Sequence, residues 1–187
     1  MRKVVLSEMV SLDGYFKGPG EGWEALDWHR GDDAEWEAYS IDTVSAADTL
    51  LFGRETYVGF QEYWPAQTTE LARLLNGIEK VVFSTMLDGV SWTGARIVRD
   101  GAAGEIARLK QLPGRDIVVF GSADFAATLI ANGLVDEFRL AYTPVVLGGG
   151  VPLFKPGQER LNLRLAGTRT FASGVVLLTF KHEAGAR

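Results

Sequence analysis

Cysteine is absent from this 187-residue sequence, and histidine occurs only twice. Without cysteine the chain forms no disulfide, has no thiolate nucleophile and offers no cysteine ligand to a metal. His29 and His182 stand alone, because neither has partners at the spacing of a metal site or a nucleophile–base pair. We therefore expect no metal site, and we interpret both histidines as lone surface residues.

Three motifs of hydrolases and nucleotide-binding proteins are also missing. The sequence contains no G-x-S-x-G nucleophile elbow, no Walker A loop and no G-x-G-x-x-G fingerprint. These absences argue against an α/β-hydrolase, a P-loop enzyme and a dinucleotide-binding domain of the ordinary Rossmann type.

Long apolar runs and excess positive charge are lacking as well. The net charge is −5, so we do not expect a broad basic face for nucleic acid, although a local anion site is compatible with it. No apolar run is long enough to span a membrane, and the N-terminus enters a strand pattern without a signal peptide. With 47% apolar and 23% charged residues, the composition is that of a globular protein. We expect a single domain over residues 1–187, located in the cytoplasm, with neither nucleic acid nor membrane as a partner.

One stretch has the pattern of a phosphate-binding turn. Ile117–Phe120 is a short β-branched run that is typical of a strand covered on both faces. Gly121 ends it, Ser122 occupies a helix N-cap position, and Ala123–Ala131 is a good helix former. A strand, a glycine turn and a capped helix present free backbone N–H groups to an anion, although an ordinary turn in an α/β protein has the same pattern.

The pattern occurs a second time, with a cation beside it. Thr49–Phe52 is a strand, and Gly53–Tyr57 opens a helix with Arg54 in its first turn. Ser84 and Thr85 end a third strand, where their hydroxyls either donate to phosphate oxygens or cap the next turn. Two helix starts, one arginine and two hydroxyls fit a dinucleotide with several phosphate groups.

The rest of the chain predicts a mainly parallel sheet. Strand and helix patterns alternate through the middle, and the end reads as a hairpin, Leu161–Phe171 and Val175–His182, that turns at residues 172–174. Leu12–Gly31 is a long, glycine-rich and aromatic loop, which we expect to act as a substrate or cofactor lid rather than as a static plug. Asp32 or Asp33 is expected to cap a helix that runs to about Ala46.

Several short motifs, taken together and in order, resemble the dihydrofolate-reductase-like superfamily. They are SLDG (Ser11–Gly14), GRETY (Gly53–Tyr57), YWP (Tyr63–Pro65), VVFST (Val81–Thr85), VVFGSADFAATLIANGLVDEFRL (Val118–Leu140) and TPVVLGGGVPLF (Thr143–Phe154). The sequence is most similar to the group built as the C-terminal reductase domain of the bifunctional riboflavin-biosynthesis deaminase–reductase. The resemblance extends from Val4 to about Lys181.

The resemblance implies a fold and a cofactor. The fold is a three-layer α/β arrangement with a central, mostly parallel eight-stranded sheet, helices on both faces and an antiparallel C-terminal hairpin. The cofactor is NADPH, and the implied binding residues are Gly53, Arg54, Thr56, Ser84, Thr85, Gly121, Ser122, Ala123 and Asp124. Within this set Ser84 and Thr85 receive the adenosine 2′-phosphate. Dihydrofolate reductases carry two glycines where this chain has Gly121-Ser122, and both this difference and Asp124 fit the riboflavin-type group better.

The resemblance also implies a reductase acting on a pterin-like or aminopyrimidine-like heterocycle. The substrate acid is Glu37 by its distance from the GR motif, with Asp33 as an alternative on the same helix and Asp13 of the SLDG turn as the other candidate. Thr143 is expected to face the substrate from a strand end. Trp64, Gly148 and Gly149 are expected to line the substrate site.

Two readings of function stay open. The first is a catalytic NADPH-dependent reductase of the dihydrofolate-reductase or riboflavin-pathway type. The second is a non-catalytic NADPH-binding sensor or interaction module on the same fold, because fold does not imply function. Related domains are often dimers, and the apolar C-terminal hairpin predicts a homodimer that pairs at a sheet edge.

Overall fold

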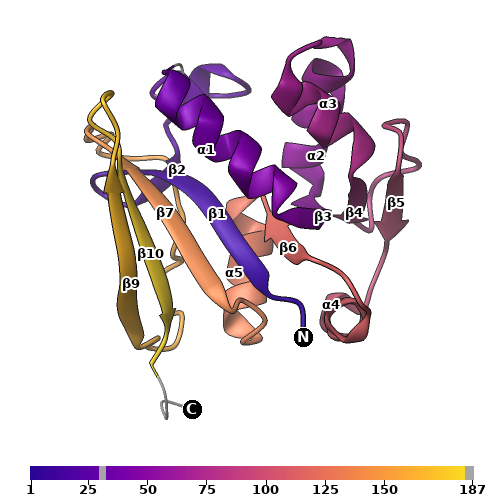
Figure 1. The fold of residues 1–187 in the computed structure, drawn as a ribbon. Helices are drawn as coiled ribbons and strands as arrows, with labels where there is room; N and C mark the ends of the chain where they lie inside the picture. Colours follow the sequence, from indigo (N-terminus) through magenta and orange to yellow (C-terminus); the bar gives the residue numbers. More distant parts are fainter. Residues whose placement is uncertain (30–32, 184–187) are drawn as a thin grey trace.

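A twisted eight-stranded sheet forms the centre of the computed structural model, which describes residues 1–29 and 33–183 (Figure 1). The strands of this sheet are β1 (Val4–Ser11), β3 (Ala47–Gly53), β4 (Glu79–Phe83), β5 (Ala95–Val98), β6 (Asp116–Val119), β7 (Glu137–Thr143), β9 (Leu163–Thr170) and β10 (Val176–His182). Their order across the sheet is β5-β4-β3-β6-β1-β7-β10-β9. β10 runs antiparallel to both of its neighbours, and the other described pairs are parallel.

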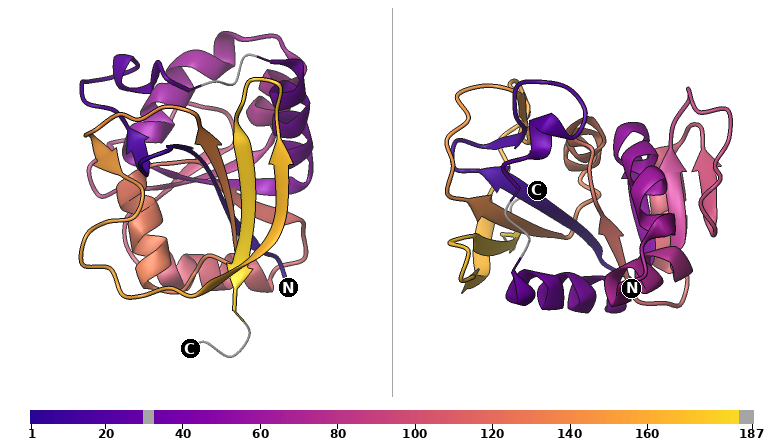
Figure 2. Two further views of the ribbon diagram at one scale, coloured as in Figure 1. Left: turned by 90° about the vertical axis from the view of Figure 1, so that its left-hand side faces the viewer. Right: turned by 90° about the horizontal axis from the view of Figure 1, so that it is seen from above.

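Helices cover both faces of the sheet, which makes three layers. They are α1 (Ala34–Ser45), α2 (Arg54–Tyr63), α3 (Glu70–Gly77), α4 (Ala102–Gln111) and α5 (Ala123–Ala131), with short 3₁₀ turns η1 (Glu24–Leu26) and η2 (Trp64–Ala66). The first three helices contribute to one buried cluster, and α4 and α5 contribute to the other. The view from above shows α1 and α5 on opposite sides of the sheet (Figure 2). The expected fold class is confirmed. No described helix is long and apolar enough to cross a membrane.

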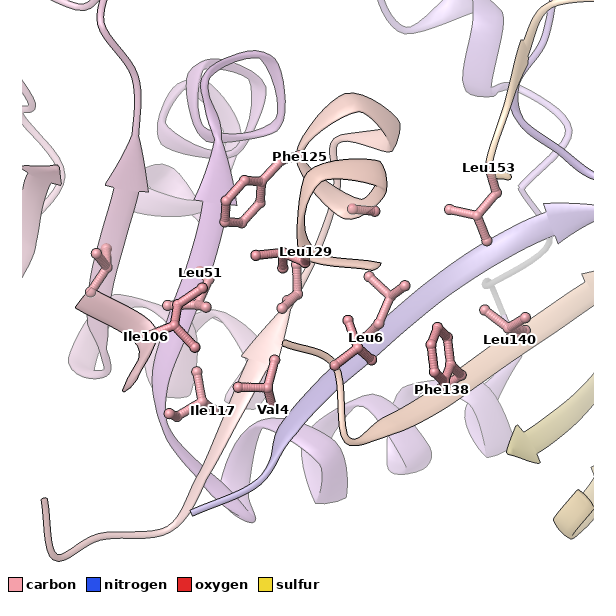
Figure 3. Close-up of a cluster of buried hydrophobic side chains, with 14 of the residues drawn as sticks. Val4, Leu6, Leu51, Ile106, Ile117, Phe125, Leu129, Phe138, Leu140 and Leu153 are labelled. Atoms are coloured by element: carbon pink, nitrogen blue, oxygen red, sulfur yellow. The ribbon is translucent and has the colours of Figure 1, made fainter. Parts of the chain in front are cut away.

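Alternation along the central strands divides the core between the two faces. Ile117 and Val119 of β6 pack toward α4 and α5, whereas Val118 between them packs toward α1, α2 and α3. Figure 3 shows one side, where Leu51 and Ile117 lie below Leu129 of α5. Because both faces are covered here, β3, β4 and β6 each contain a continuous apolar run, as buried parallel strands generally do.

β1 and β6 separate part-way along their length. They pair only from Val4–Leu6 to Ile117–Val119, although β1 continues to pair with β7 as far as Ser11 and Thr143. Beyond Leu6, β1 therefore has no partner on its β6 side. The sheet opens there, and Ser7, Glu8 and Met9 line the larger cavity of the molecule.

The segment after β1 is more ordered than its glycine content predicts. Residues 15–17 form strand β2 (Tyr15–Lys17), which pairs with β8 (Val151–Pro152) in a second, two-stranded antiparallel sheet. Trp28 is buried, and its indole N–H donates to the Ala25 carbonyl at 3.0 Å. The expectation of an irregular loop is therefore wrong for part of this segment, because the β2–β8 pairing satisfies backbone groups that a loop leaves to water.

The start of α1 and the C-terminal hairpin follow the expected local chemistry. The Asp33 carboxylate caps α1 by accepting the Trp36 N–H at 2.7 Å, whereas Asp32 lies outside the described residues. The C-terminal hairpin turns at residues 172–174, as expected, with the Phe171 N–H donating to Val175 O. β9 is an exposed edge of the sheet, and the homodimer that would pair there stays a prediction.

A buried hydroxyl on α2 anchors the connection between β4 and β5. Tyr57 is fully buried, and its hydroxyl accepts the buried backbone N–H of Trp92 at 3.2 Å. We expect Tyr57→Phe to lower the free energy of unfolding by about 1–3 kcal/mol, because the Trp92 N–H is left without a partner. Denaturant unfolding measures this. Tyr63→Phe, on the same helix but half exposed, is the control, and an equal effect of the two changes would contradict the prediction.

Candidate active site

Two cavities meet at the carboxyl ends of the central strands. The larger has a volume of about 840 Å³ and lies where β1 leaves β6, with walls from α1, α2, α3 and residues 16–29. The smaller has a volume of about 390 Å³ and lies at the ends of β4 and β5, beside α5. Arg54 lines both, so a ligand long enough to occupy the two cavities passes its side chain.

The N-termini of α2 and α5 lie side by side at this junction. The Gly53 N–H donates to Gly121 O at 3.4 Å, and a Cβ on Gly53 would stand 2.7 Å from the Ser122 hydroxyl. Ser122 occupies the N-cap of α5, but its side chain makes no capping hydrogen bond. Two helix ends with free N–H groups therefore face the same region, which is a favourable arrangement for a polyanion.

Gly121 is more confined than the sequence indicates. It is buried and has a φ of +51°, and a Cβ at this position would collide with the Thr56 side chain. The peptide that joins it to Ser122 is cis. The expected phosphate turn is thus not an open surface turn but a tight contact between α2 and the end of β6.

The smaller cavity brings together the hydroxyls and cations expected for an extra phosphate. Ser84 and Thr85 line it with Arg54, and Arg99 adds a second guanidinium from the end of β5. The Ser84 hydroxyl oxygen also accepts the N–H groups of Met86 and Leu87, each at 3.1 Å. Ser84 therefore caps the following turn, and its own O–H stays available as a donor.

Other implied cofactor residues lie outside both cavities. The Ala123 side chain is buried in the core. Asp124 is exposed and pairs with Lys155 at 2.9 Å. The lysine therefore offsets part of the charge of the Asp124 carboxylate.

The expected substrate residues divide into two groups. Asp33, Glu37 and Trp64 line the larger cavity. Asp13, Thr143, Gly148 and Gly149 do not.

Asp13 has a positioning contact instead. Its carboxylate accepts the Ser11 hydroxyl at 2.7 Å and the N–H groups of Leu147 and Gly148 at 3.1 and 2.8 Å. These hydrogen bonds, the one from Ser11 foremost, lower the pKa of Asp13. Asp13 thus fixes the triple-glycine loop. Thr143 is fully buried at the end of β7, opposite Ser11.

Glu8 is a cavity residue that the sequence reasoning missed. It is the one carboxylate within the apolar strand β1, and it is 7% exposed. Its side chain accepts the Gly121 N–H at 2.6 Å, so it contacts the turn at the start of α5. Burial raises the pKa of Glu8 to about 8, and the Gly121 hydrogen bond offsets this only in part. A carboxylate inside the largely apolar run VVLSEMVS was the sequence feature that could have identified Glu8.

His29 also differs from the expectation. It lines the larger cavity and is largely shielded from solvent, with its ring 4.4 Å from that of Trp28 in an edge-on arrangement. Burial lowers the pKa of His29 to about 4, so the ring is neutral at pH 7. His182 is half-buried and its Nε2 lies 2.7 Å from Val135 O. The interpretation of both histidines as surface residues is wrong.

The sequence matches a known family over nearly its whole length. Residues 2–177 match the family model of the RibD C-terminal domain. The chain belongs to the RibD C-terminal domain family. Among curated relatives, the uncharacterized protein YyaP of Bacillus subtilis (strain 168) is 37% identical over 186 residues, which is 96% of this chain and 94% of the relative.

Solved structures confirm the dihydrofolate-reductase-like fold of this family member. A protein from Shewanella sp. PV-4, named for riboflavin biosynthesis, matches with a TM-score of 0.76 at 19% identity and covers 98% of this chain and 99% of its own. A pyrimidine reductase-like protein from Corynebacterium diphtheriae matches with a TM-score of 0.72 at 15% identity, covering 97% and 92%. The family is one of riboflavin-pathway reductase type, which agrees with the resemblance stated above.

Gly121 and Gly148 both have a positive φ, but only Gly121 is tightly packed against a neighbouring side chain. We expect Gly121→Ala to destabilise the protein by about 3 kcal/mol or more, because its Cβ meets Thr56 and backbone strain adds to the overlap. Gly148 has a φ of +69° but no atom within 4 Å of the corresponding Cβ. Gly148→Ala should therefore cost only about 1–2 kcal/mol of backbone strain. Thermal unfolding compares the two, and equal losses would contradict the packing argument.

The buried Glu8 carboxyl makes stability depend on pH. An unfolded chain releases this proton near pH 4.5, whereas the folded protein holds it to about pH 8. The free energy of unfolding that this group contributes therefore falls as the pH rises between these values. Glu8→Gln keeps an oxygen acceptor for Gly121 and removes the titration. We expect its stability relative to the wild type to rise by about 3 kcal/mol between pH 5 and pH 8.

Urea unfolding across this pH range measures the difference, and Glu159→Gln, at an exposed position, is the control. Parallel stability curves for wild type and Glu8→Gln would show that the carboxyl titrates as if it were exposed.

Proposed function

We propose that the protein is an NADPH-dependent reductase that transfers a hydride to a pterin-like or aminopyrimidine-like heterocycle. The observation that carries this proposal is the junction of the two cavities, where the starts of α2 and α5 abut and Arg54 lines both sides. Membership of the RibD C-terminal domain family supports the reductase class.

The donor set fits a dinucleotide phosphate. Arg54 and the N–H groups at the starts of α2 and α5 would hold the pyrophosphate. Ser84, Thr85 and Arg99 in the smaller cavity would hold the adenosine 2′-phosphate. The nicotinamide of such a cofactor supplies the hydride. The protein's own contribution is then to orient the two reactants and to provide a proton.

The larger cavity supplies groups for both tasks. Glu37 or Asp33 on α1 would accept N–H groups of the heterocycle, and Trp64 would pack against the ring. The protonated Glu8 carboxyl is the buried proton source within reach of this cavity, because burial keeps its proton bound at pH 7. Asp13 holds the loop at Gly148 and acts indirectly.

The cofactor assignment predicts a preference for NADPH over NADH. Because an additional charge-assisted contact contributes about 1.5–3 kcal/mol, the preference should be roughly tenfold or more. We expect Arg99→Ala to reduce that ratio and Arg54→Ala to weaken the binding of both cofactors. Arg73→Ala, on an exposed part of α3, should leave the ratio unchanged. Fluorescence titration of both cofactors gives the ratio, and equal affinities for the wild type would reject the assignment.

Turnover separates the two readings of function. A panel of pterins and aminopyrimidines is added to the NADPH complex, and the loss of nicotinamide absorbance is followed. Oxidation of NADPH with any of them supports the reductase. Tight NADPH binding without turnover on the whole panel would favour the non-catalytic sensor.

A further inference from the structure

Acidic side chains dominate the walls of the larger cavity. Among its described lining residues the carboxyl groups belong to Glu8, Asp33, Glu37, Glu55 and Glu62, whereas the cationic side chains are Lys17 and Arg54. Among the described residues, the two cavities together contain three cationic side chains, because Arg99 lies in the smaller one. The positive and negative charges are therefore not distributed evenly along the path that a ligand would take.

Two of these three cations, Arg54 and Arg99, line the smaller cavity, whereas Lys17 lines only the larger one. Arg54 lines both cavities, and its guanidinium lies 3.8 Å from the Glu55 carboxylate, which offsets part of its charge. Under the proposed function Arg54 is occupied by cofactor phosphate. Among the described lining residues, Lys17 on β2 is then the one cation left to a ligand in the larger cavity.

Two titratable groups of the larger cavity, His29 and Glu8, add no charge to its walls at pH 7. His29 is uncharged at pH 7, because burial lowers its pKa to about 4. Glu8 is also uncharged there, which leaves Asp33, Glu37 and Glu62 as the described lining acids that do not pair with Arg54. Three carboxylates against one lysine among the described lining residues disfavour an anionic ligand, and salt screens this repulsion because Glu37 and Glu62 are exposed.

Aromatic rings also line this cavity. Trp23, Tyr63 and Trp64 form a continuous row, with centroid distances of 6.5 Å between the first two rings and 5.1 Å between the last two. Trp36 of α1 lines the cavity beside Asp33 and Glu37. Aromatic faces combined with carboxylates favour planar ligands that are neutral or positively charged.

We propose that the larger cavity selects a planar nitrogen heterocycle that is uncharged or cationic and bears neither a phosphate nor a carboxylate tail. The proposal rests on the proposed function and narrows it. It excludes two otherwise plausible substrates on charge grounds, namely a phosphoribosyl aminopyrimidine and dihydrofolate with its glutamate tail. It places the distinction in Asp33, Glu37 and Glu62 rather than in the shape of the cavity.

A matched pair of ligands tests the charge requirement. Pterin and pterin-6-carboxylate share one ring system and differ by one carboxylate. Their binding to the protein saturated with NADP⁺ is measured by quenching of tryptophan fluorescence, for which Trp23, Trp36 and Trp64 line the cavity. We expect pterin to bind at least tenfold more tightly at pH 7 and low salt, and the ratio to shrink as salt is raised. Equal or tighter binding of the carboxylate, or no binding of either ligand at millimolar concentration, would overturn the proposal.

Variants that remove one charge each show which side chains cause the preference for pterin over pterin-6-carboxylate. Glu62→Gln should narrow the ratio about threefold or more, because it removes one repulsive charge and leaves Asp33 and Glu37 in place. Lys17→Met should leave the ratio unchanged or widen it. The opposite result would be that the wild type prefers pterin-6-carboxylate and that only Lys17→Met loses this preference. Lys17 would then be the residue that binds an anionic tail. Glu159→Gln, outside both cavities, is the control.

The same measurements distinguish this proposal from the reductase assignment. Ligand binding is read by fluorescence and needs no hydride transfer, and it is repeated on the protein without NADP⁺. If the protein prefers pterin but turns over no substrate, the charge-selectivity proposal stands and the reductase proposal is rejected. If it turns over substrates and prefers anionic ones, the reductase proposal stands and the charge-selectivity proposal is rejected.

Discussion

Contact between the starts of α2 and α5 is the constraint on which the site depends. Gly53 lies against Ser122, and Gly121 lies against Thr56, at distances that leave no room for a Cβ. Side chains at these two glycines would push the helix ends apart. The N–H groups of two helices would then no longer face one region, and a single arginine would no longer line both cavities.

The opening between β1 and β6 complements this contact. β6 ends at Val119, so the helix that follows it starts beside the exposed flank of β1. Glu8 occupies that flank and reaches across to the Gly121 N–H. A carboxyl group in this place would be costly if it were ionised beside a phosphate site, and burial keeps it protonated at pH 7. One side chain therefore satisfies a buried donor without adding negative charge at the anion site.

The two ends of the composite site differ in electrostatic character. Guanidinium, hydroxyl and backbone N–H groups gather around the starts of α2, α4 and α5. Carboxylates and aromatic rings gather between α1 and α2. A protein of net charge −5 thus gathers guanidinium and free N–H groups at one end of the site, and carboxylates and aromatic rings at the other.

The sequence by itself determined most central strands and helices, the fold class and the two glycine turns that open α2 and α5. Those features arise from local causes: β-branched runs such as Ile117–Val119, glycines at turns, and the capping carboxylate of Asp33. Only the tertiary structure decided which polar groups face the cavities. It turned Asp13 onto the loop at Gly148 and Asp124 toward Lys155, and it placed the buried Glu8 and the half-buried His29 at the larger cavity. Burial, and the pKa shifts that follow from it, depend on what packs across from a residue, and neighbours in the sequence do not specify this.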